Sequence, residues 1–237
     1  NTNPDGSVES TTDGTSGGET PFGTQGATSA GGGTAGSGAR ASDPAPSPNQ
    51  GDGKVVPGSG IVGPLGTLIA KAESGTKGYD AFNRGTANGQ IIPAGGSLNL
   101  TKMTIKDIMA KQALPPGSPD RLFAVGKYQM IPDTLSDAVR TLNIDPKEKF
   151  SGELQERMFN EYLISKKRPA IANYLNSPTD DPKLLHQAVK AASLEWASIA
   201  DPDIPGGRSS HYGSGNKASI TVDQMKDYLR KDREVIY

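Results

Sequence analysis

One acidic residue stands where an acid–base group could act on a polar substrate. Glu73 ends a short stretch with helical spacing of apolar residues, but it does not continue their stripe. Glycine-rich sequence with an aromatic residue follows it, so we expect its carboxyl to face a cleft between a helix and a hairpin. Burial by apolar neighbours would raise its pKa and let it hold a proton at neutral pH, as the general acid of glycoside cleavage must. The alternative is a solvated residue at a helix end.

A second group of candidate residues is the segment Gly126-Lys-Tyr-Gln129. A glycine lets a ligand approach the backbone closely. Tyr128 has a flat face and a hydroxyl for a sugar ring, and Gln129 has both a donor and an acceptor for an acetamido group. The alternative is a strand that ends in an ordinary turn.

The composition argues against several other kinds of site. The chain of 237 residues has no cysteine, which excludes disulfides, a thiolate zinc site and a cysteine nucleophile. Its two histidines, His186 and His211, argue against a histidine-rich metal centre, so we expect neither a metal nor a cofactor. A run of about 18 apolar residues is missing, so no membrane insertion is expected, and no signal peptide is visible.

Charge and glycine are unevenly distributed along the chain. Residues 1–60 contain 15 of the 30 glycines and carry a net charge of −4, whereas residues 61–237 carry +3. The first segment cannot bury enough apolar surface to offset its chain entropy, so we expect a disordered Gly/Ser/Thr/Pro-rich linker or tail. Residues 61–237 are long enough for one folded domain. Their charge is too weak to predict nucleic-acid binding.

Helical periodicity dominates the predicted domain. Apolar residues at Leu65, Leu68, Ile69 and Ala72 predict a helix that ends near Gly75. Asn-Gly at 88–89 predicts a small β-hairpin, and residues 122–130 are apolar and β-prone. Further helices are expected over residues 104–111, from 132, from 151, over 170–176, over 182–198 and from 221. The predicted fold is α+β and mainly helical, with a small hairpin beside the helix that carries Glu73.

Taken together, these pieces resemble the lysozyme-like superfamily, most closely the lambda-phage type of endolysin, which is a lytic transglycosylase of peptidoglycan. The resembling segments are Leu68–Gly75, Gly78–Asp80, Gly126–Gln129, Leu194–Ile199 and Tyr212–Gly213. They cover the whole predicted domain, and the Trp-Ala-Ser piece is the most specific to the family. The interval between Glu73 and Tyr79 is shorter than in that family, and only Tyr212 and Gly213 match in the last loop.

The resemblance implies cleavage of the β-1,4 bond between N-acetylmuramic acid and N-acetylglucosamine, with Glu73 as the single acid and base and 1,6-anhydro ends as the product. It also implies substrate contacts by a set of side chains: Tyr79, Asp80, Lys127, Tyr128, Gln129, Trp196 and Tyr212.

Two of these residues have competing interpretations. Hydrolysis in place of transglycosylation would need a second carboxylate, for which Asp80 is the nearby candidate. The alternative for Asp80 is a structural residue that bonds backbone amides of the hairpin. Trp196 is expected on the apolar face of the 182–198 helix, which favours core packing over sugar stacking.

Glycan strands of peptidoglycan are the expected partner, and the bacterial periplasm or cell wall is the expected site of action. Delivery by a phage or by secretion machinery is expected, with residues 1–60 as a possible attachment to a larger assembly. A non-catalytic wall-binding or structural domain and an inhibited effector stay open as alternatives. The basic cluster Lys166–Arg168 is interpreted as a solvated helix end. The alternative is that it attracts an acidic polymer of the cell wall.

Overall fold

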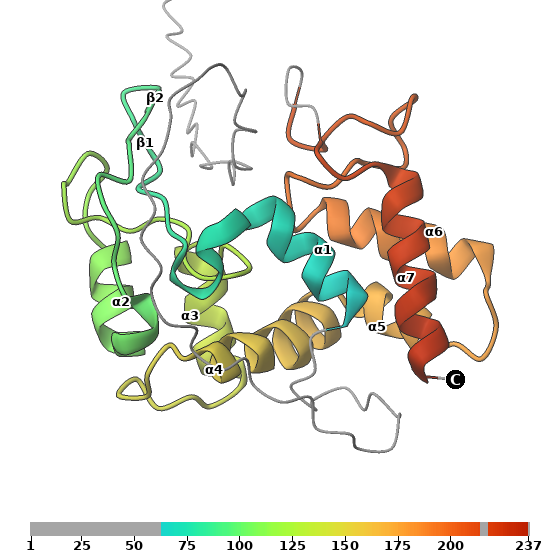
Figure 1. Ribbon diagram of the computed structural model, residues 1–237, viewed down its shortest axis with the longest axis horizontal. Helices are drawn as coiled ribbons and strands as arrows, with labels where there is room; N and C mark the ends of the chain where they lie inside the picture. Colours follow the sequence, from blue (N-terminus) through green and yellow to red (C-terminus); the bar gives the residue numbers. More distant parts are fainter. Residues whose placement is uncertain (1–62, 214–217, 237) are drawn as a thin grey trace, which may run out of the picture.

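The computed structural model describes residues 63–213 and 218–236, and the predicted tail over residues 1–60 lies outside them. The described part is mainly helical with one two-stranded antiparallel sheet, which confirms the α+β, mainly helical prediction (Figure 1). In these ranges, no helix is both long enough and apolar enough to cross a bilayer.

The elements comprise seven α-helices, two 3₁₀ turns (η1, η2), one π-helix (η3) and two strands in the described ranges. Their bounds are α1 Pro64–Glu73, η1 Gly75–Asp80, β1 Thr86–Ala87, β2 Gln90–Ile91, η2 Leu100–Lys102, α2 Ile105–Gln112, α3 Pro132–Thr141, α4 Gly152–Arg157, η3 Met158–Lys167, α5 Pro169–Leu175, α6 Pro182–Ser193 and α7 Val222–Ile236.

Local signals explain where most helices begin. Thr104 and Asp107 form a reciprocal capping box at α2. At the start of α4, the Ser151 side chain accepts a hydrogen bond from the backbone N–H of Leu154. Thr221 and Gln224 cap α7 in the same reciprocal way. Proline occupies the first turn of α1, α3, α5 and α6, where its missing N–H costs no hydrogen bond.

The predicted hairpin is present but short. Strand β1 pairs with β2 through Thr86 opposite Ile91 and Ala87 opposite Gln90. The connecting residues Asn88 and Gly89 both have positive φ, which is the turn chemistry that Asn-Gly predicts.

Helix α1 crosses the middle of the molecule (Figure 1). Helices α2 and α3 and the hairpin lie on one side of it, and α5, α6 and α7 lie on the other. Helix α7 packs on α1, and α5, α6 and α7 pack on one another. Buried side chains from both groups of helices belong to one hydrophobic core. Residues of α1 and η3 lie in this core between the two groups.

Residues 122–130 do not form the expected strand. Val125 makes only isolated bridges, to Phe82 and to Met130. The bridge to Met130 closes a tight loop, and positive φ at Gly126 and Gln129 turns the chain within it. The β-prone residues are therefore core residues of a loop.

Two helices also differ from the prediction. The helix expected over residues 182–198 ends at Ser193, and beyond it the N–H groups of Glu195 and Trp196 share the carbonyl of Ala192. Trp196 therefore lies after the helix and not on its face. The segment Met158–Lys167 is a π-helix and not a continuation of α4 with regular period.

Candidate active site

Glu73 is the last residue of α1 and is only 4% exposed. Burial raises its pKa to about 7, against the opposing effect of hydrogen bonds from Ser198 and with a further upward contribution from the carboxylate of Glu195. The predicted rise of the pKa is confirmed, and the alternative of a solvated helix end is wrong. Near neutral pH this carboxyl can both hold and release a proton.

The segment after α6 connects Glu73 to the second predicted group of residues. The Ser198 hydroxyl donates a hydrogen bond to Oε1 of Glu73. Two residues earlier, the indole Nε1–H of Trp196 donates to the backbone carbonyl of Tyr128 at 3.3 Å. Trp196 is buried, as core packing predicts. Three segments far apart in the sequence thus meet around residues 196–198.

Gly126 has a positive φ, but close approach of a ligand, which was expected, is not the reason that a glycine is needed here. Its φ is +78°, and a Cβ at this position would lie 2.4 Å from Oε1 of Gln155 and 2.8 Å from the Phe150 ring. Protein side chains, and not a ligand, make the close approach. Gln155 is fully buried; it accepts from the N–H of Lys127 and donates to the carbonyl of Tyr79. The buried amide therefore holds this loop against η1.

A buried carboxylate gathers three of the predicted substrate-binding side chains. Glu156 is 3% exposed and accepts hydrogen bonds from Tyr79 Oη at 2.9 Å, Lys127 Nζ at 2.7 Å and Tyr128 Oη at 2.7 Å. Burial and the Glu156 carboxylate raise the pKa of Tyr128, so its phenol stays a donor. The Tyr128 ring stacks on Phe159 with centroids 4.0 Å apart and is 1% exposed. The expected flat face for a sugar is therefore covered by protein, and that expectation is corrected.

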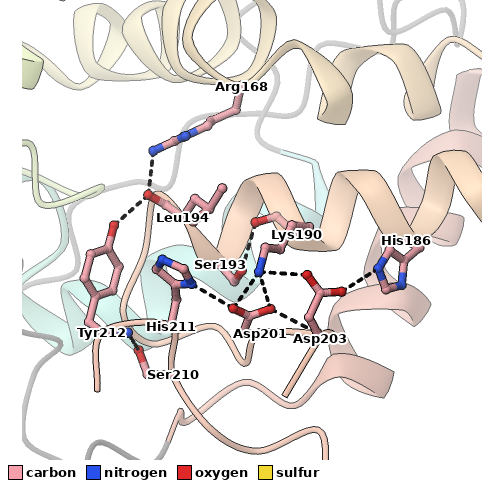
Figure 2. A network of polar contacts seen from close by, with 10 residues as sticks. All are labelled: Arg168, His186, Lys190, Ser193, Leu194, Asp201, Asp203, Ser210, His211 and Tyr212. Atoms are coloured by element: carbon pink, nitrogen blue, oxygen red, sulfur yellow. Dashed lines mark hydrogen bonds and ion pairs between the residues drawn. The ribbon is translucent and has the colours of Figure 1, made fainter. Parts of the chain in front are cut away.

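Gln129, Trp196 and Tyr212 line one pocket of about 180 Å³, together with Glu195 and Arg168. The structure thus brings together three of the predicted substrate-binding residues. Figure 2 shows that the Tyr212 hydroxyl and the Arg168 guanidinium both reach the carbonyl of Leu194, at the end of α6.

The Gln129 amide is held in place by its neighbours. Its Oε1 accepts from Asn83 Nδ2 at 3.2 Å, and its Nε2 donates to the carbonyl of Gly126 at 2.9 Å. One N–H and one lone pair beyond these two bonds are chemically available to a ligand in the pocket.

The basic cluster at the end of η3 is not simply a solvated helix end. Lys167 Nζ lies 2.8 Å from Oε1 of Glu195, and Arg168 Nε lies 2.9 Å from its Oε2. The Glu195 side chain is 7% exposed. Two cations therefore fix a buried carboxylate in the wall of the pocket, which corrects the interpretation of Lys167 and Arg168 as free surface charges.

Asp80 lies at the end of η1 and not in the lining of this pocket. Its Oδ1 accepts from the N–H of Thr101 at 2.8 Å. Asp80 therefore bonds a backbone amide, as its structural interpretation predicts. The amide belongs to η2, however, and not to the hairpin.

A polar network fastens the loop that carries Tyr212 (Figure 2). Asp201 is 2% exposed and bonds Lys190 Nζ and His211 Nδ1, both at 2.8 Å. Lys190 also pairs with Asp203 at 2.8 Å, so one lysine of α6 holds two acids of the loop. The His211 ring meets the Tyr212 ring edge-on, which positions the tyrosine at the pocket.

Three residues of the site were not predicted: Glu156, Glu195 and Ser198. The last two lie within the Leu194–Ile199 segment, whose match to the family was the available signal. Across the described residues, no group of three or more His, Asp or Glu side chains is arranged to hold a metal ion. Comparison of the chain with models of protein families, with curated proteins and with solved structures gave no match. The functional conclusion therefore depends on the geometry and on the sequence resemblance.

Proposed function

We propose that this chain cleaves the glycan strands of peptidoglycan, with Glu73 as general acid in a domain of lysozyme-like fold. The observation that carries the proposal is the buried carboxyl at the end of α1, whose pKa of about 7 matches the task of an acid at neutral pH. The pocket lined by Gln129, Trp196 and Tyr212 supports it, because it brings an amide and a phenol to a polar cavity. Glu73 does not line this pocket but is linked to its wall through Ser198, two residues after Trp196.

The chemistry needs one carboxyl group. Glu73 gives its proton to the oxygen between N-acetylmuramic acid and N-acetylglucosamine, and the bond from that oxygen to C1 of the muramic acid breaks. The resulting carboxylate takes the proton of the muramic acid 6-hydroxyl, whose oxygen bonds to C1. The product is a 1,6-anhydro ring, Glu73 regains its proton, and no water is consumed.

Ser198 and Glu195 would set the balance between these two roles. Hydrogen bonds from Ser198 stabilise the charged form of Glu73, whereas the Glu195 carboxylate and burial stabilise the neutral form. A pKa near the working pH lets the same carboxyl group donate a proton and later accept one.

Hydrolysis by a muramidase is the second candidate, because Glu195 is a second carboxylate in the pocket wall. Asp80, which the sequence suggests for this role, accepts a hydrogen bond from the Thr101 N–H at its Oδ1. Lys167 and Arg168 each pair with one oxygen of Glu195, so both oxygens are already occupied, which favours the transglycosylase route.

Mass spectrometry of material released from purified cell walls tests the proposal. We expect muropeptides with anhydro ends from the wild-type protein and none from Glu73→Gln, with circular dichroism to show that both are folded. Reducing ends would indicate the muramidase instead. Binding of walls without release of soluble fragments would overturn both enzymatic functions and favour a wall-binding domain.

The proposal places the site of action in the bacterial periplasm or cell wall. A phage particle or secretion machinery would deliver the chain, with residues 1–60 as the tether. An effector with the same chemistry would differ by having a dedicated inhibitor protein, which inhibition assays with neighbouring gene products would reveal.

A further inference from the structure

A second and larger pocket lies along α3, with a volume of about 470 Å³. Helix α3 lines it with one face, whose residues follow helical spacing: Asp133, Ser136, Asp137 and Arg140. Tyr162 and Lys167 of η3 form the opposite side. We call it the α3 pocket.

The α3 pocket is a neighbour of the pocket beside Glu195. Both are lined by Ile131, Thr134 and Lys167. The ammonium of Lys167 sits between them, because it donates to Thr134 Oγ1 at 2.6 Å and to Glu195 Oε1 at 2.8 Å. A branched ligand could therefore reach past Lys167 from one pocket to the other.

The α3 pocket contains fixed charges of both signs. Asp137 accepts a hydrogen bond from Tyr162 Oη at 2.5 Å and pairs with the guanidinium of Arg140. The hydrogen bond from Tyr162, and after it Arg140, lowers the pKa of Asp137 despite partial burial, so the group stays anionic. The Arg140 side chain is 82% exposed and can turn towards a ligand.

We propose that the α3 pocket binds the peptide attached to the lactyl group of N-acetylmuramic acid. This inference rests on the proposed function. The two sugars carry hydroxyl and acetamido groups but no ammonium group, so a purely glycan ligand would bring no cation to Asp133. The attached peptide carries both free carboxylates and an amino group, which match the exposed guanidinium of Arg140 and the carboxylate of Asp133 in the same pocket.

The test compares two substrates: glycan strands that keep their peptides and strands from which an amidase has removed them. We expect the wild-type kcat/KM to be several-fold higher on peptide-bearing strands. In Arg140→Gln this ratio should fall towards one. Lys147→Gln is the matched control, since it removes a positive charge from an exposed loop residue away from both pockets, and it should keep the wild-type ratio.

The outcomes separate the two proposals. Equal kcat/KM on both substrates would overturn the peptide site but leave the glycan-cleaving function standing. A preference for peptide-bearing strands that persists in Arg140→Gln would overturn the assignment to the α3 pocket. Failure to cleave either substrate would overturn the proposed function, and this inference with it.

Discussion

The hydroxyl of Ser198 donates a hydrogen bond to the carboxyl of Glu73, which lies 125 residues earlier in the chain. This bond joins the end of α1 to the segment after α6. It also opposes the effect of burial on Glu73, because a hydrogen bond to a carboxylate stabilises its charged form. The acid strength of Glu73 therefore depends on a contact between two distant parts of the sequence.

Replacing Ser198 by alanine should raise the pKa of Glu73 above its value of about 7. A general acid must be protonated, so the alkaline limb of the kcat/KM profile should move to higher pH. A hydrogen bond to a charged group contributes about 1.5–3 kcal/mol, which corresponds to a movement on the order of one pH unit. Cell-wall turbidity assays between pH 5 and 9 would measure it.

The control for that variant is Ser193→Ala. Ser193 is also buried, but its hydroxyl bonds the carbonyl of Lys190 and not Glu73. Its alkaline limb should stay at the wild-type position. A limb that moves downward in Ser198→Ala would contradict the assigned role of the hydroxyl.

Glu195→Gln should move the same limb in the opposite direction. The Glu195 carboxylate raises the pKa of Glu73, and it is the smallest of the contributions to that pKa. Its removal should lower the pKa by less than Ser198→Ala raises it. Glu161→Gln is a matched loss of charge from an acid that pairs with Arg157 on the helix surface. An upward movement in Glu195→Gln would rule out the electrostatic role.

Glu73 should reduce the stability of the fold at high pH. Its pKa is about 7 in the folded protein and 4.5 for a glutamate in water, so the folded state binds more protons than the unfolded state between these two values. The free energy of unfolding therefore falls as pH rises from 4.5 to 7, by on the order of 3 kcal/mol in total.

Glu73→Gln, which cannot ionise, should then be more stable than the wild type at pH 8 and equally stable near pH 4. Urea unfolding at the two pH values measures the difference. Glu148→Gln, on an exposed loop, controls for the loss of a negative charge. A Glu73→Gln protein that is less stable than wild type at pH 8 would show that burial does not disfavour the charged form of this carboxyl.

Gly126→Ala should destabilise the domain by about 3 kcal/mol, because positive φ and a steric clash act together. The added Cβ would meet Gln155 at 2.4 Å. Gly89→Ala is a matched variant, since its φ of +75° is similar but no atom lies within 4 Å of the added Cβ. It should cost only about 1 kcal/mol. Equal losses of melting temperature in the two variants would show that the contact with Gln155 contributes nothing.

Much of the helical architecture could be predicted because its signals are local. The capping box at Thr104, the cap at Ser151 and the Asn-Gly turn at residues 88–89 each need only neighbours in the sequence. The π-helix over Met158–Lys167 could not be predicted, since the same residues also suit a regular helix. This segment packs against α3 and α5.

The sequence by itself determined that Glu73 ends a helix, that Asn88 and Gly89 turn a hairpin, and that Trp196 is buried. Only the tertiary structure decided that Ser198 bonds Glu73, that Glu195 lies between two cations and that the Tyr128 ring is covered by Phe159. The physical reason is that the protonation of an acid and the exposure of a ring depend on which distant groups surround them. Spacing along the chain specifies the local backbone, whereas desolvation and charge pairing arise only when separate segments meet.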